Sequence, residues 1–487
     1  MKMDDELKVA LVSNRGPVSF LPAENGFETK RGAGGLAGAL DPVAEALGDR
    51  AVWIAAAISE TDRKAVAVGE NRRLRDTLGY WVKMLDIEPG TYARYYDVVS
   101  NRMLWFANHC LWDELEIKDF GTEELDAWDD AYVPVNRLFA DTVAEITDKS
   151  WIVLFQDYHL SMAPKFLRQQ RPDTTIFHFT HSSFCGPDAG LERLPSPIPR
   201  NVIEGMLGAD LIGFHIRAWV DNFLDCCERI GAEVDRDSGL VHHQGRRSWV
   251  REYPIPIDAA DLRERGADEA AARWAQRFRE RHTGRIIVRA DRTEPSKNIV
   301  RGFEAFGALL DRRDDLRDTR FVACLYPSRQ SMPEYQRYAD AIERVVDEVN
   351  ARHPDSIDLF MKDDFDRTLG ALSLYDVLLV NPIMDGMNLV AKEGPTLNQR
   401  DGVLVLSTGA GAYQELGEHA VGIRDPLDVT ATADALERAL EMDPTERKTR
   451  AEELRAVVEA RTPEGWIGAQ LEDLQRIKRG EAPTGVV

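Results

Sequence analysis

Short apolar runs alternate with helical patterns along this chain, and the alternation occurs twice. The strand-like runs lie at residues 8–14, 151–155, 176–180 and 210–215, and again at 285–288, 320–325, 357–360, 377–380 and 403–406. Strands that alternate with helices form parallel sheets with helices on both faces. We therefore predict an α/β protein with two doubly wound Rossmann-like domains, whose strand ends face an interdomain cleft.

A polar stretch at residues 235–251 separates the two alternations. It is followed by Pro254-Ile255-Pro256, a composition typical of a linker. The predicted domains are therefore residues 1–245 and residues 246–462. An amphipathic tail, residues 463–487, is predicted to be helical, and it can cap either domain or cross back to the first one.

The chain is acidic, with 61 Lys and Arg against 83 Asp and Glu and a net charge of −22. Such a surface repels nucleic acid and anionic membranes, so we expect neither as a partner. A phosphorylated ligand must then meet a local cluster of cations. The sequence leaves open whether the protein is a homo-oligomer.

The five cysteines form no C-x-x-C pair, which predicts a reduced chain without a cysteine metal site. The N-terminus carries acids where a signal peptide is apolar, and no stretch approaches the roughly 18 apolar residues of a membrane span. We therefore expect a cytoplasmic protein. We also expect it to need no metal or other cofactor.

The segment Asp385–Glu393 follows the apolar run 377–380 and contains Gly386. A strand that leads through a glycine turn into a helix directs backbone N–H groups and the helix dipole at one point, which suits a phosphate or a sugar hydroxyl. Asp385 is predicted at the helix N-cap, with Glu393 roughly two turns further along the same face. An ordinary strand-to-helix turn is the alternative.

Two cations, Arg292 and Lys297, follow the first strand of the second domain and can both reach one diphosphate. A solvated basic face is the alternative. Arg15 and Arg329 can hold a second, separate phosphate, because an arginine fork matches phosphate. No H-E-x-x-H, G-x-S-x-G or Walker sequence occurs, which argues against zinc proteases, serine hydrolases and P-loop NTPases.

Asp157 and His181 each follow a strand and can aim side chains at sugar hydroxyls. Structural roles are the alternative for both. The aromatic residues around Tyr96 and Trp105 can stack on a sugar face, or they can be core residues.

Several of these segments, in this order, resemble the trehalose-6-phosphate synthases, which are retaining glycosyltransferases of the GT-B fold. The resemblance covers residue 9 to about residue 416 and rests on VSNR (12–15), AGGLAGAL (33–40), YYDVVSNRMLW (95–105), QDYHL (156–160), RTEPSK (292–297) and DGMNLVAKEG (385–394). It implies an enzyme that moves glucose from a nucleoside-diphosphate glucose to glucose 6-phosphate and retains the α configuration.

The resemblance also implies residue roles. Acceptor phosphate is assigned to Arg15, Tyr96, Trp105 and Arg329, and the donor diphosphate to Arg292 and Lys297. Donor glucose and nucleotide are assigned to Gly35, Asp385, Gly386, Met387, Asn388, Leu389, Val390 and Glu393, and Asp157 and His181 are assigned to the acceptor and donor sugars. No enzyme nucleophile is required, because the leaving diphosphate helps to deprotonate the acceptor.

Three departures from the family pattern limit the transfer of roles. The loop reads His181-Ser182-Ser183-Phe184-Cys185 where many members have His-Ile-Pro-Phe-Pro, and residues 292–297 read RTEPSK where Arg-Leu-Asp-Tyr-Ser-Lys is common. Pro395 is expected to kink or end the helix after Glu393. For these reasons the sequence does not decide whether the donor carries UDP, GDP or ADP.

Two other functions stay open. One is a pseudo-glycosyltransferase that couples cyclitols, a variant that tends to lose the glycine loop present here at residues 33–36. The other is a catalytically silent member that binds sugar phosphates.

Overall fold

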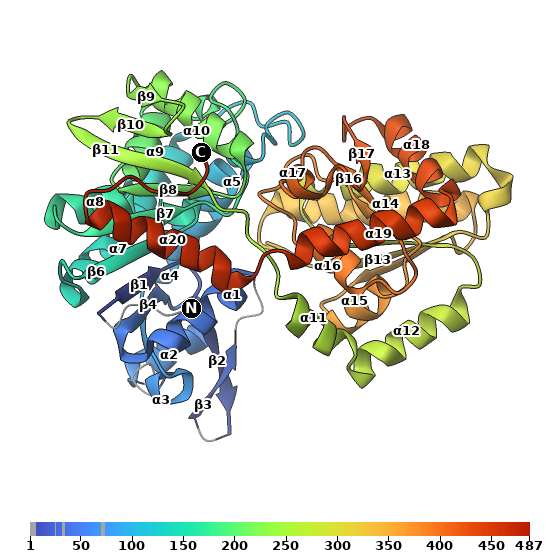
Figure 1. Ribbon diagram of the computed structural model, residues 1–487, viewed down its shortest axis with the longest axis horizontal. Coiled ribbons are helices and arrows are strands. Elements are labelled where there is room, and N and C mark those ends of the chain that lie inside the picture. The colour runs from blue at the N-terminus through green and yellow to red at the C-terminus, as the bar shows by residue number, and fades with distance from the viewer. Residues whose placement is uncertain (1–5, 25, 32–34, 70–73) are drawn as a thin grey trace. The chain divides into compact units, whose positions relative to one another are not determined.

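The computed structural model describes residues 6–24, 26–31, 35–69 and 74–487. The chain divides into two compact units, unit 1 with Met1–Ile255 and Pro463–Val487, and unit 2 with Pro256–Thr462 (Figure 1). Among the described residues, no helix is both long enough and apolar enough to cross a membrane.

Unit 1 is built on a nine-stranded sheet with the order β5-β4-β1-β6-β7-β8-β11-β10-β9. The strands are β1 Lys8–Val12, β4 Ala51–Ala56, β5 Trp81–Leu85, β6 Trp151–Gln156, β7 Thr175–Phe179, β8 Leu211–Phe214, β9 Glu233–Asp235, β10 Leu240–His243 and β11 Arg246–Glu252. A separate hairpin pairs β2 Val18–Ala23 with β3 Gly26–Arg31. All pairs from β5 to β11 are parallel, as the apolar strand sequences predict.

The strand order reverses between β1 and β6, because β4 and β5 lie on one side of β1 and the later strands on the other. The register pairs Val12 with Phe155, so both strands end at the same edge. In a doubly wound sheet, ligands bind at such a switch point. Residues that follow β1 and β6 therefore share one location.

The prediction of a linker at residues 235–251 is wrong. This stretch forms β9, β10 and β11, and Trp249–Glu252 of β11 pair in parallel with Leu211–Phe214 of β8. The polar side chains mislead because the antiparallel β9 and β10 form the outer edge of the sheet, where one face meets water. Unit 1 accordingly runs to Ile255, beyond the predicted boundary at residue 245.

The helices of unit 1 are α1 Gly35–Leu47, α2 Glu60–Ala67, α3 Leu74–Leu78, α4 Pro89–Ala93, α5 Trp105–Asn108, α6 Thr122–Ala127, α7 Val133–Ile146, α8 Ala163–Gln170, α9 Ile198–Met206, α10 Arg217–Arg229 and α20 Pro463–Lys478. Residues Arg94–Leu104 form a π-helical segment between α4 and α5. The C-terminal α20 packs on β7 and α1 (Figure 1). Its Trp466 donates a hydrogen bond to the carbonyl of Tyr253 at 2.9 Å.

Unit 2 carries a six-stranded parallel sheet with the order β14-β13-β12-β15-β16-β17. The strands are β12 Ile286–Arg292, β13 Arg320–Tyr326, β14 Ile357–Met361, β15 Val377–Val380, β16 Val403–Ser407 and β17 Val421–Ile423. Here the order reverses between β12 and β15. The prediction of two doubly wound parallel sheets is thus confirmed.

The helices of unit 2 are α11 Ala259–Gly266, α12 Glu269–Arg281, α13 Ile299–Arg312, α14 Pro333–Arg352, α15 Phe365–Leu372, α16 Val390–Leu397, α17 Tyr413–Leu416, α18 Val429–Glu441 and α19 Pro444–Glu459. Alternation along β15 explains how the sheet is covered. Val377 and Leu379 join the core formed with α13, α14 and α18, whereas Leu378 lies against Gly394 of α16, where a Cβ would come within 2.2 Å. Such close packing requires glycine at position 394.

Pro395 does not end α16, which continues to Leu397. The proline sits in a helix of eight residues, so the one hydrogen bond that it removes lies near the helix end.

The structure joins Cys110 to Cys185 in a disulfide that spans 75 positions of sequence, with the Cα atoms 6.3 Å apart. The prediction of a fully reduced chain is therefore wrong for this pair, because the topology brings two cysteines together that no spacing motif links. Cys226, Cys227 and Cys324 are buried thiols.

Candidate functional site

In unit 2 the candidate site lies at the carboxyl ends of β12 and β15, where the strand order reverses. Arg292 is the last residue of β12, and Lys297 ends the short turn that follows it. Asp385 follows β15. The fold thus brings together three residues that are separated by up to 93 positions in the sequence.

Lys297 lies between two carboxylates. Its Nζ donates to Oδ2 of Asp385 at 2.5 Å and lies 3.8 Å from Oδ1 of Asp291. Burial alone would lower the pKa of Lys297, but these two carboxylates raise it above its ordinary value. Lys297 is therefore held as a cation at the switch point.

Asp291 is itself supported by Arg289, whose Nε donates to it at 2.9 Å. A second arginine nitrogen of Arg289 donates to the carbonyl of Lys297 at 2.8 Å, and Arg289 is fully buried. The sequence reasoning missed both residues. Their signal was present, since two charges inside the apolar strand IIVRADR must be paired when buried.

Arg292 and Arg329 meet at one carboxylate, that of Glu294. Oε1 of Glu294 lies 3.1 Å from Nη1 of Arg292 and 3.6 Å from Nη1 of Arg329, and it accepts the hydroxyl hydrogen bond of Ser328 at 2.8 Å. The sequence reasoning assigned the two arginines to separate phosphates and did not single out Glu294. The link arises because β12 and β13 are adjacent, so their following loops touch.

The loop before α16 differs from its predicted form at one end. The helix starts at Val390, so Asp385 lies outside it and is not the N-cap. Instead the backbone of Asp385 pairs with the loop after β16, its N–H donating to Gly409 at 2.9 Å and its carbonyl accepting from Gly411 at 3.1 Å. This pairing fixes Asp385 towards Lys297.

The rest of this loop presents backbone and half-buried side chains. Asn388 adopts a φ of 70° and donates to Asp385 at 3.1 Å, while Met387 is buried. Leu389 and Val390 are half-buried, as is Glu393 in the first turn of α16. Burial raises the pKa of Glu393 to about 7, although the charge of Lys297 partly opposes the rise.

In unit 1 the candidate site lies at the carboxyl ends of β1 and β6. Arg15 follows β1 and donates to the hydroxyl of Tyr96 at 3.3 Å. The ring of Tyr96 stacks between Tyr92 and His159, with centroids 5.6 Å from each. The π-helical segment Arg94–Leu104 therefore carries the predicted phosphate ligand Tyr96 to the strand end.

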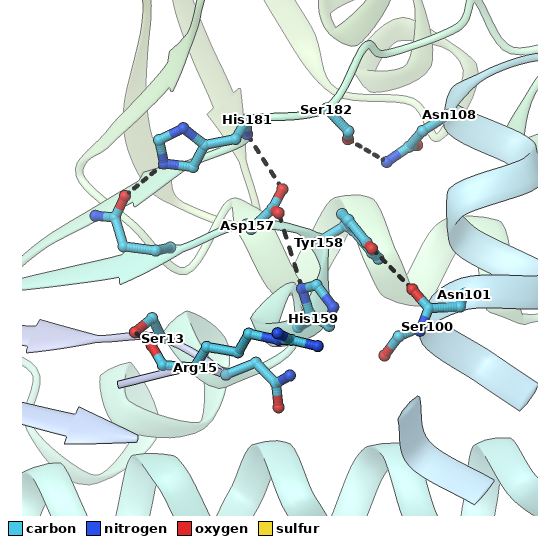
Figure 2. A network of polar contacts seen from close by, with 12 residues as sticks. Ser13, Arg15, Ser100, Asn101, Asn108, Asp157, Tyr158, His159, His181 and Ser182 are labelled. Carbon is cyan, nitrogen blue, oxygen red and sulfur yellow. Dashed lines mark hydrogen bonds and ion pairs between the residues drawn. The ribbon is translucent and has the colours of Figure 1, made fainter. Parts of the chain in front are cut away.

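Asp157 follows β6 and adopts a φ of 73°, a left-handed conformation that is unusual for a residue with a side chain. Its Oδ1 accepts from the backbone N–H of His181 at 3.1 Å, and its Oδ2 lies 3.8 Å from Nδ1 of His159 (Figure 2). The fold thus brings together the predicted pair Asp157 and His181.

The ring of His181 lies 2.9 Å from the amide oxygen of Gln156. Burial lowers the pKa of His181 well below its ordinary value, and His215 and His178 lower it further. At neutral pH this imidazole is uncharged, so it offers a hydrogen bond and not a positive charge.

Trp105 begins α5 and is buried against His109, with ring centroids 3.8 Å apart. Nearby amides tie the surrounding segments together, since Tyr158 donates to Asn101 at 3.0 Å and Asn108 donates to Ser182 at 3.0 Å (Figure 2). Asn108 and His159 were not singled out from the sequence, because a residue that organises a site through hydrogen bonds or stacking carries no spacing signal.

Gly35 is the first residue of α1, while the preceding residues 32–34 of the glycine segment lie outside the described residues. Within the described ranges, no group of three or more His, Cys, Asp or Glu side chains is arranged to hold a metal ion.

Comparison with known proteins identifies relatives over most of the chain. Residues 7–476 match the model of the family described as Glycosyltransferase family 20. A trehalose-6-phosphate synthase of Mycobacterium sp. (strain JLS) is 32% identical, with 96% of each chain covered. A validamine 7-phosphate valienyltransferase of Streptomyces hygroscopicus subsp. jinggangensis is 31% identical, with 87% of this chain and 85% of that one covered.

Among solved structures, the UDP-forming alpha,alpha-trehalose-phosphate synthase of Burkholderia vietnamiensis superposes with a TM-score of 0.79 at 27% identity. The match covers 96% of this chain and 99% of that one. The resemblance inferred from sequence segments is thereby confirmed.

Proposed function

This chain belongs to glycosyltransferase family 20, and from that premise we propose that it transfers glucose from a nucleoside-diphosphate glucose to glucose 6-phosphate. The product is trehalose 6-phosphate, formed with retention of the α configuration. The observation that carries the proposal is the cluster of Arg292, Lys297 and Asp385 at the switch point of unit 2. Ligands of doubly wound sheets bind at that place.

The donor is assigned to unit 2. Arg292 is half-exposed and Lys297 is held as a cation, so together they can neutralise the charge that grows on the departing diphosphate. Asp385 and the backbone of Gly386, Met387 and Asn388 take the glucose hydroxyls. Leu389 and Val390 line the nucleotide, and Glu393 accepts from the ribose.

The acceptor is assigned to unit 1. Arg15 and Tyr96 already share a hydrogen bond, so a phosphate placed between them receives two donors without rearrangement of the backbone. Trp105, at the start of α5, belongs to the same unit. Asp157 takes the acceptor hydroxyls, and the uncharged His181 donates to or accepts from the donor sugar.

On this proposal the chemistry needs no protein nucleophile. Asp385 is engaged by Lys297, which suits it to hold hydroxyls and not to act as a general acid. The bond between the sugar and the diphosphate breaks while the acceptor hydroxyl attacks from the same face, and the leaving diphosphate takes the proton. Positioning and charge stabilisation supply the rate.

A cyclitol-coupling reaction is the second candidate, and the relative named as a validamine 7-phosphate valienyltransferase favours it. Its acceptor would also be a phosphorylated ring. The residues of unit 1 therefore do not distinguish the two candidate reactions. The identity of the donor distinguishes them.

The test is a donor panel of UDP-, GDP- and ADP-glucose with glucose 6-phosphate, followed by release of nucleoside diphosphate and by identification of the disaccharide phosphate. The UDP-forming relative leads us to expect UDP-glucose as the best donor. Release of the nucleotide without disaccharide, or binding without release, would contradict the proposal. Turnover only with a cyclitol donor would favour the second candidate.

A further inference from the structure

A buried carboxylate lies between the two arginines that are assigned to the donor and acceptor phosphates. Glu294 is fully buried, and a single oxygen, Oε1, lies within 3.6 Å of a nitrogen from both Arg292 and Arg329. Its second oxygen, Oε2, has no hydrogen-bond partner in the part of the chain that the structure describes. An anion is thus built into a site that must attract anions.

This carboxylate is ionised at every working pH. Burial would raise the pKa of Glu294, but Arg292, Arg329, Lys297 and the hydroxyl of Ser328 lower it to about 2. A buried ion with one unsatisfied oxygen is costly, so packing alone does not explain its presence.

We propose that Glu294 is the shared counter-ion of Arg292 and Arg329 and that it limits how tightly the diphosphate of the donor is held. The inference rests on the proposed function. Arg292 is 52% exposed and open to a ligand, whereas Arg329 is only 8% exposed. Glu294 offsets part of the positive charge that a diphosphate meets at Arg292, so the product diphosphate can leave.

Two effects of removing the carboxylate oppose each other. The arginines lose an ordering partner, which weakens anion binding, but the site gains net positive charge, which strengthens it. The Glu294 carboxylate and a diphosphate about 6 Å away repel each other across an effective dielectric constant of about 20. This repulsion is larger in free energy than the entropic cost of ordering one arginine side chain. The charge effect wins, so neutral Glu294 should bind diphosphate more tightly.

The shared carboxylate also links Arg292 to Arg329 within unit 2. Without Arg329, the full charge of Glu294 falls on Arg292, and diphosphate binding should weaken although Arg329 itself is assigned to the acceptor. Diphosphate binding at Arg292 therefore depends on Arg329 through Glu294.

The test compares Glu294→Gln, Glu294→Asp and Arg329→Met by calorimetry with UDP and with inorganic pyrophosphate, which has no base. Asp376→Asn is the matched control, because Asp376 is also buried and also holds two arginines, Arg400 at 3.3 Å and Arg447 at 3.4 Å. It precedes β15 and so lies at the opposite end of the strand from Asp385.

For Glu294→Gln we expect both probes to bind about tenfold tighter and the kcat to fall several-fold as UDP release slows. Glu294→Asp keeps the charge and should stay within about threefold of the wild-type affinity, and Arg329→Met should bind UDP at least about threefold more weakly. The control should lose stability without a change in either affinity.

Unchanged or weaker binding in folded Glu294→Gln would overturn the inference and leave the proposed function standing. If that variant does not fold, unchanged UDP binding in Arg329→Met would overturn it equally. Wild-type protein that neither binds UDP nor turns over would overturn both the inference and the proposed function.

Discussion

The two switch points of this protein are built from different chemistry. In unit 2, opposite charges alternate from Arg289 through Asp291 and Lys297 to Asp385, each pair within 3.8 Å. In unit 1, the corresponding strand ends carry stacked rings, amides and an uncharged histidine around Arg15. The same strand order therefore supports a charge-stabilising site in one unit and a hydrogen-bonding and stacking site in the other.

This difference predicts that substitutions in unit 2 act mainly on the rate and substitutions in unit 1 mainly on acceptor binding. A fixed charge near a departing diphosphate contributes most in the transition state. Stacking and hydrogen bonds around a phosphate that does not react contribute equally before and during the reaction.

Arg292→Ala should show the largest effect, a loss of kcat of about 10²–10³-fold with the fold intact, since it removes one charge that stabilises the leaving group. The measurement is steady-state turnover together with an unfolding midpoint. Arg400→Ala is the control, because Arg400 is 42% exposed and lies 3.3 Å from Asp376 in the same unit. Full activity of Arg292→Ala would remove the diphosphate assignment.

Tyr96→Phe should act on the acceptor alone. The phenyl ring keeps the stacking on Tyr92 and His159, but the hydroxyl that accepts from Arg15 is lost. We expect the KM for glucose 6-phosphate to rise about tenfold, as for a lost hydrogen bond to a charged group, with the donor KM unchanged.

Tyr80→Phe is the matched control, since Tyr80 is a buried tyrosine of the same unit that donates to Asp41 and precedes β5, at the amino end of that strand. A rise in donor KM for Tyr96→Phe, without a change for the acceptor, would break the division between the two sites.

These predictions also show what the sequence could reveal. Apolar strand runs and the order of cations, acids and glycines predicted both doubly wound sheets and placed Arg292, Lys297 and Asp385 together. The ion-pair partners Glu294 and Asp291 were not predicted, because the residues that they contact depend on which loops become neighbours after the strands pair. The edge strands β9 and β10 were mistaken for a linker, because a strand with one face in water has too little apolar character to be recognised from its sequence.

Donor binding should depend on pH through Glu393. Burial raises the pKa of Glu393 from 4.5 to about 7, whereas accepting ribose hydroxyls favours the ionised carboxylate. UDP affinity should therefore increase about fivefold from pH 6 to pH 8, with release of a proton that calorimetry in different buffers detects. Glu393→Gln should show a smaller increase, because only the terminal phosphate of UDP, whose second pKa is about 6, then still titrates. An equal increase in both proteins would remove the assignment.

The raised pKa of Glu393 also predicts how the stability of the protein depends on pH. Because its folded pKa lies above the unfolded value, the stability that it contributes is fully present below pH 4.5 and is lost as the pH rises through about 7. The unfolding midpoint of the wild type should fall over this interval by more than that of Glu393→Gln. Equal falls in both proteins would mean that other groups dominate.

The disulfide between Cys110 and Cys185 should affect stability more than activity. It joins the segment after α5, which carries Trp105, to the loop that contains His181, and Ser183 and Asn108 already hydrogen-bond beside it at 2.8 Å. A crosslink over 75 positions constrains the unfolded chain by about 4 kcal/mol in the chain-entropy treatment. A reductant should lower the unfolding midpoint of the wild type but not that of Cys110→Ser/Cys185→Ser. The kcat should change less than about twofold, because the hydrogen bonds of Asn108 and Ser183 still hold the loop. A kcat loss as large as that of Arg292→Ala would show that the unit 1 site depends on covalent restraint, and the contrast between the two switch points would then lie in rigidity as well as in charge.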